Sequence, residues 1–145
     1  MAVVCLATRR YTTAARFFND AFAAKPDLEH TEERDAAIMA AAQARCGLGE
    51  DPPRPDATEQ GYWRQQALRW LRAELDFQHR QLQSGKLADR YGVQNVLRIW
   101  QRRPELAGIR DEAELAKLSD EERGEFRKFW SDVTALLKQA DPIGD

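Results

Sequence analysis

The sequence predicts an all-α protein of stacked antiparallel helical hairpins, with about five main helices and one short one. Apolar residues recur at spacings of three and four, as they do on one face of a helix, and no segment sustains a period of two. Prolines, glycines and helix-capping residues divide the chain into segments of helical length. Short connections between such helices favour antiparallel neighbours.

The length and composition indicate one globular domain over residues 1–145. The net charge of -2, from 22 Lys+Arg and 24 Asp+Glu, gives no general attraction to nucleic acid or acidic membranes. Cys5 and Cys46 form neither a CxxC pair nor a disulfide framework, so we expect a reduced, cytoplasmic setting. No stretch reaches the roughly 18 apolar residues of a membrane span. Met1–Thr8 is apolar but lacks the basic start of a signal peptide.

The first two predicted helices differ in the size of their apolar residues. Tyr11–Ala24 carries aromatic and small residues on one face, and Pro26 ends it. The second helix runs from about Thr31, a candidate N-cap, to Cys46. Its body is almost all alanine, which lets a neighbouring helix approach closely, so we expect it to be central and crowded. A proline-rich loop follows at residues 50–57.

The third and fourth helices carry three of the four tryptophans. Asp56–Glu59 resembles a capping box that opens a long third helix, which Ser84–Gly85 closes. Asp89 is a candidate cap for the fourth helix, and Pro104 follows its end. The apolar faces of the two helices include Trp63, Ala67, Trp70, Leu71 and Leu75, and then Val93, Val96, Leu97 and Trp100.

Two further capping boxes predict the last helices. Asp111–Glu114 opens a short helix that ends near Leu118, and Ser119–Glu122 opens a long one. The long helix ends at Asp141, and residues 141–145 are expected to be a disordered tail. Its apolar stripe comprises Phe126, Phe129, Trp130, Val133, Leu136 and Leu137.

The segment Tyr11–Pro26 resembles the second helix of a tetratricopeptide repeat. Its landmarks are Tyr11, Ala14, Phe17, Phe18, Ala21 and Pro26. The resemblance implies a right-handed solenoid fragment, in which alanines lie at helix crossings and aromatics fill the grooves between hairpins. It also implies that helix Thr31–Cys46 lines a concave groove that binds a protein segment. The candidate partner-binding residues on that helix are Arg34, Met39 and Arg45.

The repeat pattern begins part of the way through a unit. Ala2–Leu6 would be the last turns of a first helix, and Arg9 stands where the family favours glycine. We therefore expect the Phe18–Phe22 face to be partly uncovered. As an alternative function, the chain is a regulatory part of a larger polypeptide and is separate from it only through truncation.

Nearly the whole chain also resembles the helical C-terminal tail of planctomycete-type bacterial serine/threonine protein kinases. The matching segments are Cys46–Gly49, Arg64–Arg72, Trp100–Asp111, Leu115–Leu118 and Arg127–Trp130. This resemblance implies a non-catalytic appendage that binds substrates or regulators of a kinase. The glycine-rich loop, the HRD-type loop and the DFG motif of a kinase are absent from the sequence, so no catalytic residue is carried over.

Arginines on the third and fourth helices raise the alternative of nucleic-acid binding. They are Arg69, Arg72, Arg80, Arg98, Arg102 and Arg103, with Trp100 among them. We favour the interpretation that Arg69 and Arg72 pair with acidic neighbours such as Glu74 and Asp76, while Trp100 belongs to the core.

Metal binding and acid–base catalysis are weakly indicated. Asp76 and His79 lie three residues apart, but one such pair is more typical of a solvated helix face. The acidic clusters Glu32–Glu33 and Asp120–Glu122 are explained by their places at helix starts.

The sequence therefore predicts a protein-interaction module without enzymatic activity, metal or cofactor, whose protein partner it does not identify. The residues expected to carry the packing are Tyr11, Ala14, Phe18, Ala21, Pro26, Trp63, Ala67, Trp70, Trp100 and Trp130.

Overall fold

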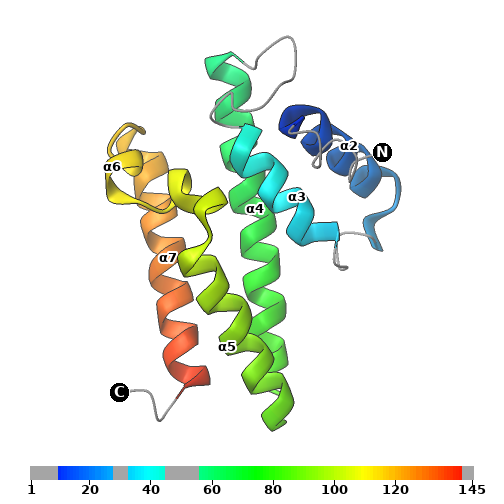
Figure 1. The fold of residues 1–145 in the computed structure, drawn as a ribbon, viewed down its shortest axis with the longest axis vertical. Coiled ribbons are helices and arrows are strands. Elements are labelled where there is room, and N and C mark those ends of the chain that lie inside the picture. The colour runs from blue at the N-terminus through cyan, green and yellow to red at the C-terminus, as the bar shows by residue number, and fades with distance from the viewer. Residues whose placement is uncertain (1–9, 28–32, 45–55, 142–145) are drawn as a thin grey trace. The chain divides into compact units, whose positions relative to one another are not determined.

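The computed structural model describes residues 10–27, 33–44 and 56–141, and all the regular structure in these ranges is helical (Figure 1). The predicted all-α class is confirmed. The contacts of the chain divide it into two compact units, Met1–Leu71 and Arg72–Asp145, and the boundary falls within a helix. The repeat-type solenoid and the single domain stay predictions. The two units are described separately.

The first unit contains α2 (Tyr11–Ala24), α3 (Glu33–Ala44) and the first part of α4 (Ala57–Leu82). The bounds of α2 agree with the sequence prediction, since Pro26 disfavours helical geometry at the residue before it. α2 packs on α3. On α3, Ala37, Ile38 and Ala40–Ala42 are completely buried, which confirms the crowded environment expected for the alanine-rich helix.

Helix α2 also packs on the start of α4. The ring of Phe22 meets Trp70 edge-on, with centroids 5.5 Å apart, and Asn19 donates a hydrogen bond to the Tyr62 hydroxyl over 3.1 Å. Phe18 and Phe22 are each only 4% exposed. The prediction of a partly uncovered Phe18–Phe22 face is therefore wrong, because Trp70 packs against Phe22 in this unit.

The N-cap predicted at Asp56 is present at the start of α4. A carboxylate oxygen of Asp56 accepts a hydrogen bond from the backbone N–H of Glu59 over 2.8 Å. The Glu59 side chain pairs with Arg16 of α2. The expected first helix Ala2–Leu6, the cap at Thr31, residues 50–55 of the proline-rich loop and the end of the tail lie outside the described residues.

The second unit contains the rest of α4, then α5 (Leu87–Arg102), the 3-10 helix η2 (Pro104–Ile109), α6 (Glu112–Leu115) and α7 (Asp120–Ala140). A tight turn joins α4 to α5, and Gly85 in it has a φ of 73°, which glycine adopts without steric cost.

Helix α5 runs antiparallel to α7. Midway along α5, Gln94 donates a hydrogen bond to the carbonyl oxygen of Ala140, the last residue of α7, over 2.5 Å. Trp100, near the end of α5, packs on Phe129 with ring centroids 6.0 Å apart. α4 runs parallel to α7, as Figure 1 shows.

Two carboxylates that the sequence predicts as helix caps bind other side chains instead, and the cap predicted at Asp89 is wrong. α5 begins at Leu87, so Asp89 lies in its first turn and accepts a hydrogen bond from the Ser84 hydroxyl over 2.6 Å. Asp111 is the N-cap residue of α6, as predicted, but its side chain makes no capping hydrogen bond; its carboxylate accepts a hydrogen bond from Arg110 over 3.1 Å. α6 also ends at Leu115, before the predicted Leu118.

The helix η2, which buries Leu106 and Ile109, was not predicted from the sequence. Arg110 secures its start by donating hydrogen bonds to the carbonyl oxygens of Trp100 and Arg103, over 3.0 and 2.8 Å. The indole N–H of Trp130 donates to the carbonyl oxygen of Ile109 over 2.8 Å. The helix is therefore fixed by long-range side-chain contacts.

Most of the predicted packing residues are buried. Ala14, Phe18, Trp63, Ala67, Trp70 and Trp100 belong to the interior of their units. Tyr11, Ala21 and Trp130 are half-buried, and Pro26 is exposed.

The caps of α6 and α7 provide a matched test. The hydroxyl of Ser119 accepts a hydrogen bond from the backbone N–H of Glu122 over 3.2 Å, as the capping box predicts. Ser119→Ala should lower the free energy of unfolding by about 1 kcal/mol, because an orphan N–H of α7 loses its acceptor. Asp111→Ala should cost less than about 0.5 kcal/mol, since the side chain of Asp111 makes no capping hydrogen bond. Urea unfolding of both variants measures the two costs, and equal costs would contradict the assignment.

Candidate functional site

The partner-binding residues expected on α3 are not accessible. Arg34 is 1% exposed and Met39 is 7% exposed, so neither side chain is presented to a partner. The tight packing of the alanine-rich helix buries both residues, and their role in partner binding stays a prediction. Arg45 lies outside the described residues.

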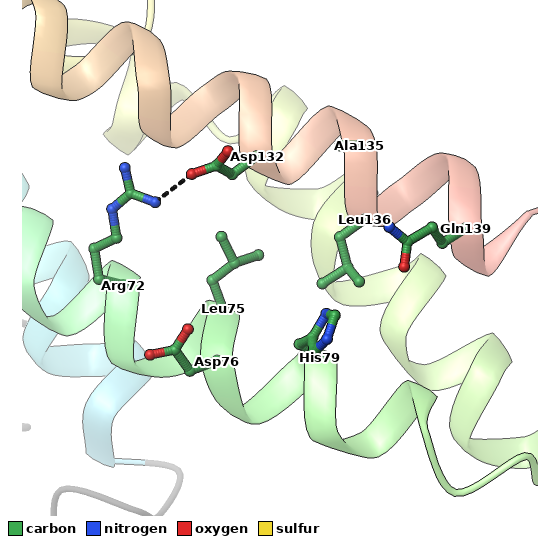
Figure 2. A pocket seen from close by; sticks show the side chains of 8 residues that line it. All are labelled: Arg72, Leu75, Asp76, His79, Asp132, Ala135, Leu136 and Gln139. Atoms are coloured by element: carbon green, nitrogen blue, oxygen red, sulfur yellow. Dashed lines mark hydrogen bonds and ion pairs between the residues drawn. The ribbon is translucent and has the colours of Figure 1, made fainter.

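The second unit instead carries an open groove between its part of α4 and α7. The groove has a volume of about 350 Å³. Figure 2 shows the two helices that form its walls. The residues that line it are Arg72, Leu75, Asp76 and His79 of α4, and Asp132, Ala135, Leu136 and Gln139 of α7.

The lining residues of each helix lie on one helical face. On both helices they follow one another at spacings of three, one and three residues, so they span two turns. At 1.5 Å per residue, the groove is roughly 10 Å long. Leu75 and Leu136 are largely buried and form the apolar floor. Asp76, His79, Ala135 and Gln139 are exposed and form the rim.

An ion pair closes one end of the groove. A guanidinium nitrogen of Arg72 lies 2.6 Å from a carboxylate oxygen of Asp132, as Figure 2 shows. The guanidinium also lies over the ring of Phe129, 5.2 Å from the ring centroid. The prediction that Arg72 pairs with a neighbour such as Asp76 is wrong, because Arg72 reaches across to α7.

The ion pair fixes the charge of Asp132. The hydrogen bond from Arg72 lowers the pKa of the Asp132 carboxyl below its ordinary value, and Lys128, four residues earlier on α7, lowers the pKa further. Asp132 therefore stays ionised at neutral pH and is poorly suited to proton transfer there.

His79 and Asp76 occupy the rim beyond the ion pair. His79 hydrogen-bonds through its ring to Gln83, one turn later, over 3.1 Å. In the part of the chain that the structure describes, no three His, Cys, Asp or Glu side chains are grouped as a metal site would require. The rim is consistent with the solvated helix face that the sequence favoured.

A second hollow, of about 200 Å³, lies between α4 and α5. Phe77 of α4 and Gly92 and Val96 of α5 contribute to its lining. It is smaller than the α4–α7 groove and carries no ion pair across it, among the described residues.

Several arginines that suggested nucleic-acid binding serve structural contacts. Arg98 pairs with Asp141 after the end of α7. The Nε atom of Arg103 lies 3.8 Å from a carboxylate oxygen of Glu105. Their charges are therefore compensated.

The pairing of Arg72 with Asp132 was not predicted from the sequence. These residues are 60 positions apart, so helical spacing does not bring them together. One signal was present: Asp132 lies between Phe129 and Leu136 on the apolar side of α7, where a carboxylate requires a partner.

No family model, curated protein or solved structure matches the chain. Among the described helices, none combines the length and the apolar character needed to cross a membrane.

The pKa of Asp132 tests the ion pair. Arg72→Met keeps the alkyl stem but removes the guanidinium, so the pKa of Asp132 should rise toward its ordinary value. Because the pKa is lowered in the folded state, the stabilisation is present above the ordinary value and is lost as the pH falls through the lowered one. NMR titration of the Asp132 carboxyl carbon measures the shift.

Lys128→Met is the matched control. It should raise the pKa of Asp132 by less than Arg72→Met, since Arg72 has the larger effect. An unchanged pKa in Arg72→Met would mean that the ion pair does not persist in solution.

Proposed function

We propose that the chain is a non-catalytic protein-interaction module that holds a short segment of another protein in the α4–α7 groove. The observation that carries the proposal is the groove itself, with an apolar floor, a polar rim and a length of two helical turns. A helix or an extended peptide binds in such grooves through one or two apolar anchors.

The charges of the groove favour binding over catalysis. Arg72 and Asp132 neutralise each other, and the lowered pKa of Asp132 opposes a role as a proton donor at neutral pH. The partly exposed pair, at 34% and 38% side-chain exposure, is accessible to a bound segment. The ion pair therefore offers polar contacts to a bound segment, and binding does not require an unpaired charge to lose its hydration.

The sequence resemblances support the same class of function. The repeat-like segment Tyr11–Pro26 and the kinase-tail segments are both associated with protein binding. In this proposal the fold is a repeat-type helical array, and the module works in the cytoplasm next to a kinase domain.

Nucleic-acid binding is the less favoured function. The net charge is -2, and Arg72 and Arg98 already pair with carboxylates. Binding to nucleic acid would also weaken steeply with added salt, because counterions are released on association.

A pull-down with a groove-blocking variant tests the proposal. Ala135 is exposed on the rim, so Ala135→Trp should fill the groove without disturbing the core. We expect the wild-type chain to retain a protein from bacterial lysate at high salt, and Ala135→Trp to reduce its retention at least about tenfold.

Ala113→Trp on α6 is the control, since it adds the same bulk at an exposed site outside the groove. The control should bind as the wild type does. Retention of RNA alone, and only at low salt, would contradict the proposal, as would equal retention by Ala135→Trp.

A further inference from the structure

Asp76 is the uncompensated charge of the groove lining. Its side chain is exposed at the α4 rim, and within the described part of the chain no cation pairs with it (Figure 2). Arg72 is nearby on the same helix but is committed to Asp132 and to the face of Phe129. A segment that enters the groove therefore meets one free negative charge beside the apolar floor.

The ends of the two helices add negative potential at the same end of the groove. α4 ends at Leu82 and α7 ends at Ala140, and the two helices are parallel. His79 and Gln139 lie in these last turns and line the groove. The carbonyl ends of helices carry partial negative charge and favour cations. Arg80 and Lys138 are also in the last turns, but they do not line the groove.

From these charges we infer the chemistry of the partner segment: an apolar side chain with a lysine or arginine about one helical turn away. This inference rests on the proposed function. The apolar side chain contacts the floor at Leu75 and Leu136, and the cation reaches the carboxylate of Asp76. In a helical segment, side chains three or four residues apart lie on the same face, so an apolar residue and a cation one turn apart can both face the groove.

The same charges exclude acidic segments. A glutamate or aspartate near Asp76 would face a like charge, so its approach is disfavoured. The ion pair of Arg72 and Asp132 does not offset this effect, because its two charges cancel.

A peptide-display selection on the full chain tests the inference. The probe is a library of random 12-residue peptides, selected on the immobilised wild-type chain and counted by sequencing. The selected peptides should combine an apolar residue with Lys or Arg three or four positions away, and Ala135→Trp should abolish their binding. Circular dichroism and urea unfolding verify that each variant is folded.

Charge reversal supplies the decisive comparison. Asp76→Lys should weaken binding of the selected basic peptides about tenfold, because an attraction becomes a repulsion. Asp76→Asn should weaken it about two- to fivefold, since only the attraction is lost. Asp20→Lys makes the same charge change on α2, at an exposed site outside the groove, and should leave the affinity unchanged. A selection repeated on Asp76→Lys should enrich Asp and Glu at the same peptide position.

Two results would overturn the inference in distinguishable ways. Peptides that lose binding in Ala135→Trp but are acidic or neutral, and that bind Asp76→Lys normally, would leave the docking function intact and reject a basic partner. Failure to select any peptide that depends on the groove would contradict the proposed function itself.

Discussion

The ring of Phe129 is the contact on which the second unit depends. It is completely buried, and three side chains from three helices surround it: Trp100 of α5 at 6.0 Å, Trp130 of α7 at 5.0 Å and the guanidinium of Arg72 of α4 at 5.2 Å. Trp130 in turn hydrogen-bonds to the carbonyl oxygen of Ile109, which attaches η2. One aromatic side chain thus joins every long helix of this unit, and buried aromatic groups are major contributors to core stability.

The geometry of the groove follows from this packing. Because the guanidinium of Arg72 lies over the Phe129 ring, it is held where it can pair with Asp132. The two charges therefore neutralise each other at one end of the groove. Asp76, one turn further along α4, faces solvent on the rim. The packing of the core therefore determines which charge remains for a partner, and it links the fold to the proposed docking function.

The sequence predicts local features of this protein better than long-range ones. The bounds of α2 and the cap of α7 at Ser119 depend on residues a few positions apart, and both are correct. The side chains of Asp89 and Asp111 were expected to cap helices, but Ser84 and Arg110, which are close to them in the sequence, donate hydrogen bonds to their carboxylates instead. The groove could not be predicted, because its ion pair joins residues 60 positions apart and its floor requires the parallel packing of α4 and α7.

A double-mutant cycle between Arg72→Met and Phe129→Leu tests the central claim that this ring holds Arg72 in place. Urea unfolding of the wild type, both single variants and the double variant gives the coupling energy. We predict a coupling of about 1 kcal/mol, the size of a cation–π contact with a partly desolvated guanidinium. Lys117→Met, whose lysine pairs with Glu114 on the exposed side of α6, serves as the control and should be additive with Phe129→Leu. Additivity of Arg72→Met and Phe129→Leu to within about 0.3 kcal/mol would contradict the claim.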